Sequence, residues 1–163
     1  MANIKKEQYL DMILNEVELS PVFIEFYNKT KEKSIPWGVV SGGFRTGIVP
    51  FLEKHGIEDI DIYANDLIFN EDYLEIKFKD GEEQDCCDYG PCGNCKIGLY
   101  ERFKKKYDTV IFIGDGITDK PVANIADIVF AKDSLLDYVE EKRIDHIPWD
   151  DFNDINRILF NMG

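Results

Sequence analysis

Two aspartates, Asp115 and Asp119, follow an apolar run at residues 110–113 in the stretch VIFIGDGITDK. A hydrophobic strand that ends in two acids usually delivers them to one point in space, where their oxygens can hold a cation. The competing interpretation is that Asp119 only caps the helix that follows it. The pattern therefore predicts a cation site, with helix capping as the alternative for the second acid.

A hydroxyl and two glycines follow a second apolar run, since Ser41, Gly42 and Gly43 come directly after Val39 and Val40. In a parallel α/β sheet, ligands bind where the strands end at their carboxyl edges. A serine hydroxyl and glycine amides that a ligand can approach closely suit an anion such as phosphate. The alternative is that this turn only lets the chain leave the strand.

Lys96 lies between these two motifs in the chain, at the start of a predicted helix. A single lysine is most often a solvated surface residue, and that interpretation stays open. The formal net charge of −13 repels free anions, so phosphate chemistry in this chain needs a local cation. Lys96 is the candidate for neutralising the charge of a bound phosphoryl group.

Four cysteines, Cys86, Cys87, Cys92 and Cys95, lie in one glycine-bearing loop directly before the lysine. In a reducing compartment such a cluster favours metal ligands over disulfides, and tetrahedral Zn²⁺ would suit four thiolates. Against a structural Zn²⁺, the spacing is tighter than in zinc ribbons, and adjacent cysteines are awkward as joint ligands. A disulfide, a redox pair of Cys92 and Cys95, and reduced thiols remain as alternatives.

Helical and strand patterns alternate along the chain, which is typical of an α/β fold with a mostly parallel sheet. The predicted helices cover residues 3–16, 20–33, 44–55, 96–107, 119–126, 134–142 and 150–161. The predicted strands lie at 34–43, which we expect to be buried, in the hairpin-like region 59–80, and at 109–114, 127–132 and 145–149. We expect a single domain, 1–163, with a leading helix within 1–20 and the cysteine-bearing loop at 80–95.

Composition excludes several classes of protein. Apolar residues make up 44% and charged residues 31% of the sequence, as in ordinary globular proteins. A net charge of −13 disfavours a nucleic-acid partner, because a phosphate backbone would be repelled. No apolar run is long enough to span a membrane, and the first residues lack the pattern of a secretory signal. The expected location is the cytoplasm.

The order Ser-Gly-Gly, lysine, Gly-Asp-Gly-x-Thr-Asp resembles the haloacid dehalogenase (HAD) superfamily of phosphatases, which form an aspartyl-phosphate. The stretches IPWGVVSGG, CGNCK, IGDGITD, AKDSLLDYV and HIPWDDF are similar to the phosphoserine-phosphatase-like group and, within it, to phosphatases of methionine salvage. The resemblance covers residues from about 17 to 160. It implies a three-layer, Rossmann-like α/β core that hydrolyses a small phosphorylated metabolite with Mg²⁺.

The resemblance also implies roles for individual residues. Ser41 with the amides of Gly42 and Gly43 would bind the phosphoryl group, and Lys96 would balance its charge and that of the nucleophile. Asp115, with help from Asp119, would hold Mg²⁺.

One element of the HAD pattern is missing from this sequence. HAD phosphatases have a central strand ending in Asp-x-Asp-x-Thr, whose first aspartate attacks phosphorus and whose second acts as acid and base. Before Ser41 the sequence has a single aspartate, Asp11, in a helical context. We therefore expect a core that lacks its first central strand and most of the cap. Such a chain should be inactive, or nearly so, on its own.

Several explanations of this pattern stay open. The chain could be a non-catalytic remnant that binds phosphate or Mg²⁺ weakly, one half of a split enzyme, or the product of a misassigned start. Strand edges left open by a missing neighbour expose unpaired amides and carbonyls, which pair readily with another chain. A homo-oligomer or a complementing fragment that supplies the strand is therefore an expected partner.

Other conspicuous side chains are assigned structural roles. His55 is expected to meet the end of a helix, where its charge is favourable, and Trp37 and Trp149 are expected to pack in or beside the core. For Arg45, directly after the Ser-Gly-Gly turn, a surface ion pair and a contact to a substrate anion are the two interpretations.

Overall fold

A computed structural model describes residues 4–78 and 95–160 of the chain. These residues fall into two compact units, an N-terminal one within 4–78 and a C-terminal one within 95–160, each with its own sheet and core. No helix in the described ranges is long and apolar enough to cross a membrane.

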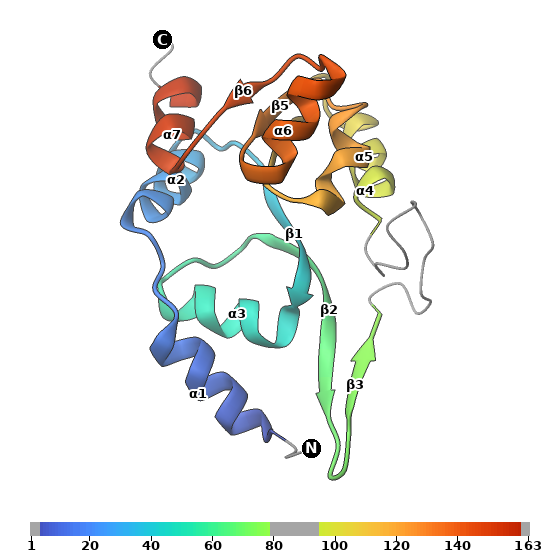
Figure 1. Ribbon diagram of the computed structural model, residues 1–163. Helices are drawn as coiled ribbons and strands as arrows, with labels where there is room; N and C mark the ends of the chain where they lie inside the picture. Colours follow the sequence, from blue (N-terminus) through green and yellow to red (C-terminus); the bar gives the residue numbers. More distant parts are fainter. Residues whose placement is uncertain (1–3, 79–94, 161–163) are drawn as a thin grey trace. The chain divides into compact units, whose positions relative to one another are not determined.

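The N-terminal unit combines a three-stranded sheet with three helices (Figure 1). Its elements in chain order are α1 (Lys6–Glu16), α2 (Pro21–Glu32), β1 (Gly38–Phe44), α3 (Arg45–Lys54), β2 (Asp61–Phe69) and β3 (Leu74–Lys77). The strand order is β1-β2-β3, with β1 parallel to β2 and β3 antiparallel to β2. The predicted hairpin in 59–80 is confirmed.

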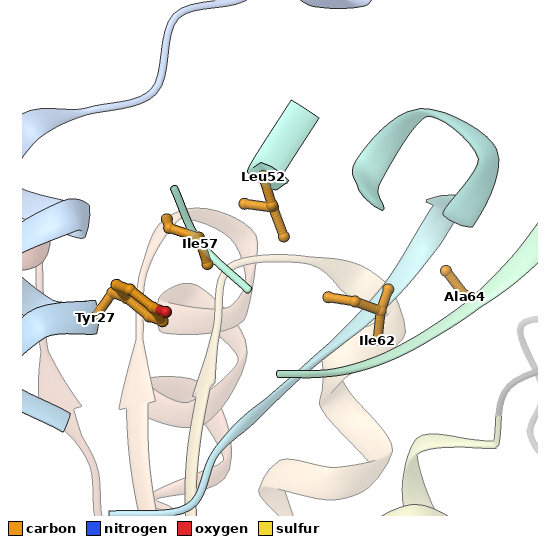
Figure 2. Packing of buried hydrophobic residues seen from close by; sticks show 5 residues of the cluster. All are labelled: Tyr27, Leu52, Ile57, Ile62 and Ala64. Carbon is orange, nitrogen blue, oxygen red and sulfur yellow. The ribbon is translucent and has the colours of Figure 1, made fainter. Parts of the chain in front are cut away.

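The core of this unit lies between α2, α3 and β2. Five buried residues from these elements and the α3–β2 connection form one cluster (Figure 2): Tyr27, Leu52, Ile57, Ile62 and Ala64. The helix predicted at 20–33 is confirmed as α2, which begins at Pro21 and buries Phe26, Tyr27 and Thr30.

The end of α3 follows the sequence signal at His55 and Gly56. Gly56 adopts a φ of 72°, a conformation that glycine tolerates at little cost, and its amide bonds the carbonyl of Glu53. His55 stands at the C-terminal cap and stacks on Phe51, with ring centroids 4.8 Å apart. The prediction that His55 lies at a helix end is confirmed.

The C-terminal unit has a fully parallel sheet covered by short helices (Figure 1). Its elements in chain order are α4 (Lys96–Lys104), β4 (Ile111–Gly114), the 3₁₀ turn η1 (Ile117–Asp119), α5 (Lys120–Ala123), β5 (Ile128–Ala131), α6 (Asp133–Lys142), β6 (Ile147–Pro148) and α7 (Phe152–Phe160). The strand order is β4-β5-β6, and its buried cluster comprises Ala123, Val129, Ala131, Leu135 and Val139.

The parallel register of this sheet brings three chain segments to one edge. Gly114 pairs with Ala131, and Ala131 pairs with Pro148, so the strands end side by side. The next residues along the chain, Asp115 and Trp149 among them, therefore meet at the carboxyl edge of the sheet, where α/β folds bind ligands.

Three sequence-based expectations about elements need correction. The strand predicted at 34–43 is not buried: Val39 and Val40 in β1 are partly exposed, and the following two glycines are exposed. The helix predicted at 119–126 is shorter, because Asp119 ends the 3₁₀ turn η1 and α5 ends at Ala123. The predicted strand 109–114 is shorter, beginning at Ile111. The single domain stays a prediction.

Candidate functional site

Asp119 is the centre of the loop that follows β4. The residue is 4% exposed, and its Oδ2 accepts hydrogen bonds from the backbone amides of Asp115 (3.0 Å) and Gly116 (2.9 Å). A carboxylate that accepts two amides fixes the path of the loop, because each bond restrains the backbone directly. The loop is therefore shaped by its own buried acid.

Lys96 contacts the other oxygen of the Asp119 carboxylate. Its Nζ forms a short ion pair with Oδ1 of Asp119 and lies 3.1 Å from Oγ1 of Thr118. The side chain is 17% exposed and stands at the first position of α4, where Sγ of Cys95 accepts the amide of Gly98. The structure thus brings together Lys96 and Asp119, which the sequence placed at separate points of the chain.

Asp115 differs from Asp119 in having no engaged carboxylate. Its side chain is exposed and forms no ion pair or hydrogen bond with any described residue. Its backbone carbonyl is fixed by the amide of Leu135 (3.2 Å) and the hydroxyl of Ser134 (3.3 Å). A rigid backbone therefore presents an available carboxylate to the solvent.

Gly114 shows how closely this loop is packed. A methyl group on its Cα would lie 2.8 Å from Oδ2 of Asp119 and 2.8 Å from the ring of Phe112, closer than real side-chain atoms approach. Its carbonyl accepts the amide of Lys132 and the indole Nε1–H of Trp149, each at 3.2 Å. The end of β4 is therefore held by the segments that follow β5 and β6.

The Ser-Gly-Gly turn in the N-terminal unit interrupts the pairing of β1 with β2. Val40 is opposite Tyr63 but Phe44 is opposite Asn65, so residues 41–43 bulge from the ladder. The amide of Gly43 donates to Oγ of Ser41 at 3.0 Å. A bulge of this kind redirects backbone groups away from the sheet, as is common next to active sites.

Arg45, after this turn, forms no surface ion pair with a described residue, so that interpretation is not supported, while a contact to a substrate anion stays a prediction. Its Nη1 donates to the backbone carbonyl of Ile62 at 3.1 Å, across to the neighbouring strand. The guanidinium therefore ties the start of α3 to β2, and no ion pair of Arg45 occurs in the described residues.

A family model described as "Hydrolase: haloacid dehalogenase-like hydrolase" matches residues 2–127, which is more than half of the chain. The chain belongs to the haloacid dehalogenase-like hydrolases. Its α/β fold with mostly parallel strands is accordingly a Rossmann-like HAD core.

Individual HAD relatives are also similar over most of this chain. It is 37% identical to the bifunctional enzyme MtnB/MtnX of Bacillus licheniformis over 94% of its own length and 35% of that protein. It is 32% identical to the 2-hydroxy-3-keto-5-methylthiopentenyl-1-phosphate phosphatase of Bacillus pumilus, covering 93% of this chain and 64% of that one. The protein of the same name from Brevibacillus brevis is 32% identical, with 94% and 68% covered. The chain thus spans between about a third and two thirds of these relatives.

The HAD residues predicted from the sequence are divided between the two units. Ser41, Gly42 and Gly43 belong to the N-terminal unit, whereas Lys96, Asp115 and Asp119 belong to the C-terminal one. A joint site that uses both sets is therefore a prediction.

The cysteine cluster falls mostly outside the described residues of this HAD chain. Cys86, Cys87 and Cys92 are not described, while Cys95 is unpaired and caps α4. Within the described ranges no group of three or more histidine, cysteine or acidic side chains could hold a metal ion. The proposed structural Zn²⁺ therefore gains no support.

Three side chains near the loop after β4 were not predicted from the sequence as part of a site: Thr118, Ser134 and Trp149. For Trp149 a signal was present, because it is the last residue of the predicted strand 145–149 and so was expected at the sheet edge that carries Asp115. Thr118 lies within the motif, but the partner of its hydroxyl depends on where the first turn of α4 lies.

The N-terminal unit has a surface hollow of about 370 Å³. Its lining includes Trp37, Glu58 and Asp61, at the beginning of β1 and β2. Ser41 lies near the opposite end of β1, so the hollow is not part of the candidate phosphate site.

Proposed function

We propose that this chain carries the cation-binding and phosphate-binding parts of a Mg²⁺-dependent HAD phosphatase, and that turnover needs an aspartate from another segment. The observation that carries the proposal is the Lys96–Asp119 ion pair next to the unengaged carboxylate of Asp115. A lysine and a free carboxylate at the carboxyl edge of a parallel sheet are what binding of a phosphoryl group together with a cation requires.

The proposed substrate is a small phosphomonoester. Two of the relatives cited above are named as phosphatases of 2-hydroxy-3-keto-5-methylthiopentenyl-1-phosphate, which supports this class of substrate. The chain spans only part of these relatives, so activity and substrate are both part of the proposal. We also propose the cytoplasm as the location.

The described donors fit the phosphoryl group in the following way. Oγ of Ser41 accepts the amide of Gly43, which leaves its own O–H free to donate to a phosphoryl oxygen. An added methyl on Gly42 would meet nothing within 4 Å, so the backbone there is open to an approaching anion. Lys96 would supply the compensating positive charge.

The carboxylates fit Mg²⁺, which prefers hard oxygen ligands and keeps several waters. Asp115 would hold the ion, because its carboxylate is not engaged elsewhere among the described residues. Asp119 would help by fixing the amide of Asp115 and orienting Lys96. When bound, the ion would supply positive charge that offsets the oxygens of the phosphoryl group.

The attacking aspartate is proposed to come from another segment, because the sequence contains no Asp-x-Asp-x-Thr. The pair Asp59 and Asp61 has the right spacing but stands where β2 begins. Ser41 follows the paired residues of β1, and β1 is parallel to β2, so the two features lie at opposite edges of one sheet. That pair is therefore not a candidate nucleophile.

Among the edge strands of the two described sheets, β1 and β4 are the ones that lead into the predicted site residues. In the part of the chain that the structure describes, β1 pairs with β2 alone and β4 pairs with β5 alone. Both edge strands are apolar and carry no charged residue, which in natural proteins is unusual for an edge left in solvent. This supports a split site completed by a strand from a fragment or a second chain.

The test is hydrolysis of p-nitrophenyl phosphate with Mg²⁺, first by the chain alone and then with a co-expressed segment consisting of an apolar strand and Asp-x-Asp-x-Thr. We expect no turnover by the chain alone and turnover with the segment. The matched control replaces the first aspartate of the segment by asparagine, and Asp115→Asn in the chain should also abolish turnover.

Two other outcomes would change the proposal. Turnover by the chain alone that Asp115→Asn abolishes would refute the need for another segment. No turnover with the segment, combined with no Mg²⁺ binding by calorimetry, would favour a non-catalytic remnant. The cysteine cluster is a separate question, and the zinc content of the purified protein decides it.

A further inference from the structure

The outer edge of β3 carries backbone groups that no described strand uses. β3 pairs with β2 on one side, and the amide of Asn70 donates to the carbonyl of Tyr73 where the hairpin closes. In an antiparallel ladder, hydrogen-bonded and non-hydrogen-bonded pairs alternate. The backbone groups of Glu75 and Lys77 therefore point to β2, and those of Leu74 and Ile76 point outward.

The side chains at this edge are apolar and uncovered. Leu74 is 44% exposed and Ile76 is 47% exposed. They lie opposite Phe69 and Leu67 of β2, so they extend the sheet face on which Tyr9 of α1 packs against Phe69 (ring centroids 5.5 Å apart). An edge strand with outward hydrogen-bonding groups and an apolar face is a template for pairing with another strand.

We propose that two copies of this chain associate through their β3 edges, antiparallel, with the two-fold axis at Ile76. The β1-β2-β3 sheets of the two copies then form one continuous sheet, and the two Ile76 residues form a hydrogen-bonded pair at its centre. Leu74 of each copy lies opposite Phe78 of the other, which extends the apolar contact.

Charge selects this register over its neighbours. With the axis at Ile76, Glu75 of each copy lies opposite Lys77 of the other, so two oppositely charged pairs form. If the axis lay at Glu75, the carboxylates of the two Glu75 residues would repel each other. If it lay at Lys77, the two Lys77 ammonium groups would repel each other. A shift of the register by one residue would place the apolar side chains of one copy on the same sheet face as the charged side chains of the other.

The four-residue strand limits the strength of this contact. Stable protein interfaces bury more surface than one short strand pair provides, so the dimer is of the weak, concentration-dependent kind. Each copy also carries a net charge of −13, so the measurement belongs at about 0.15 M salt, where long-range repulsion is screened.

The experiment is sedimentation velocity over a range of concentrations on the wild-type chain, Glu75→Lys, Lys77→Glu, and an equimolar mixture of the two variants. Each single variant places like charges opposite each other twice in the dimer, and we expect its dissociation constant to rise roughly tenfold or more. The mixture restores opposite charges at both pairs, so a heterodimer should form with about the wild-type affinity.

The mixture also separates the proposed contact from effects within one chain. Lys77 lies opposite Asp66 of its own chain, so Lys77→Glu adds a like-charge pair there, whereas Glu75 lies opposite Ile68. Mixing leaves these internal pairs unchanged, so recovery can come only from contact between copies. Circular dichroism checks that each variant is folded.

A matched control is Glu18→Lys, which makes the same change of charge at an exposed residue outside the sheet and should leave association unchanged. The proposal is overturned if the wild-type chain is monomeric throughout, if both single variants associate as it does, or if the mixture forms no heterodimer.

Discussion

The loop after β4 carries the predicted cation-binding residues and the turn after β1 the predicted phosphate-binding residues, and these two segments are built differently. The β4 loop encloses Asp119, which is 4% exposed and bonded to two amides and to Lys96. The β1 turn bulges from its ladder, and its one side-chain bond joins Ser41 to Gly43 two residues along, at an exposed position.

The difference lies in how far each segment is held by contacts within its own unit. In the β4 loop the Asp119 carboxylate bonds the amides of Asp115 and Gly116 and the ammonium of Lys96, so this part of the loop is fixed by folding. In the β1 turn the two glycines are exposed, and one bond between Ser41 and Gly43 is the side-chain contact found there. The loop should therefore be sensitive to mutation through stability, and the turn through binding.

The largest expected effect is that of Asp119→Asn. The change removes one partner of a buried ion pair and leaves the Lys96 ammonium uncompensated, so we expect the C-terminal unit to lose about 3–5 kcal/mol of unfolding free energy. Hydrogen exchange at the amides of Asp115 and Gly116 should accelerate accordingly. The measurement is urea unfolding combined with exchange monitored by NMR.

Asp115→Asn is the matched control for this substitution, since it makes the same chemical change four residues away. Its carboxylate is exposed and not engaged by any described residue, so the unfolding free energy should change by less than about 0.5 kcal/mol. Equal losses in the two variants would contradict the contrast between a fixed acid and an available one.

A smaller effect is expected from Gly114→Ala. The added methyl would lie 2.8 Å from Oδ2 of Asp119, so the loop must shift, at a cost of about 1–3 kcal/mol. Gly42→Ala is the control in the β1 turn, where the methyl meets nothing within 4 Å. Thermal unfolding of both variants tests the contrast, and equal midpoints would show that the β4 loop is no more closely packed than the turn.

Much of the local structure was predictable because its signals are short-range. Pro21 and the apolar spacing after it specify α2, and Gly56 specifies the end of α3, since each acts through its own backbone. The Gly-Asp-Gly-x-Thr-Asp spacing singled out Asp119, but its side chain does not cap α5 and instead bonds the preceding amides of Asp115 and Gly116.

The contacts that hold the site were less predictable because they join distant segments. The bond from Trp149 to Gly114 spans 35 residues and depends on the register of β4, β5 and β6, which no local pattern specifies. The exposure of β1 was missed for the same reason: Val39 and Val40 read as a buried strand, but burial depends on what lies at the open edge.

Trp149→Phe sharpens the comparison, because it removes the indole N–H donor and keeps an aromatic ring at this position. The carbonyl of Gly114 keeps the amide of Lys132, so the loss should be about 1 kcal/mol for one neutral hydrogen bond. The control is Trp37→Phe, which changes an aromatic cluster in the N-terminal unit and should leave exchange at the amide of Asp115 unaffected. An unchanged C-terminal unit in Trp149→Phe would show that the indole bond does not hold the end of β4.

The smallest expected effect concerns the pH dependence of the unit that holds the β4 loop. The pKa of Asp127 is lowered by its hydrogen bond from Lys104 and then by the amide of Val110, which lies 2.8 Å from Oδ2. The same contact raises the pKa of Lys104. This link fastens the end of α4, the helix that begins with Lys96, to the segments before β4 and β5.

The direction of both pKa shifts defines the pH window in which this link stabilises the fold. A lowered carboxyl pKa contributes stability that is present above the unfolded value of about 3.9 and is lost as the pH falls through the folded value. A raised lysine pKa contributes stability below about 10.4 that is lost as the pH rises through the folded value. Asp127→Asn should therefore lower the unfolding midpoint at pH 7 by a few degrees at most, and the difference from wild type should shrink in acid. The control is Asp137→Asn, at an exposed acid with no ion pair to a described residue, whose difference from wild type should not shrink in acid. If the difference in unfolding midpoint between Asp127→Asn and wild type is the same at every pH, the contact does not stabilise the unit through its charge.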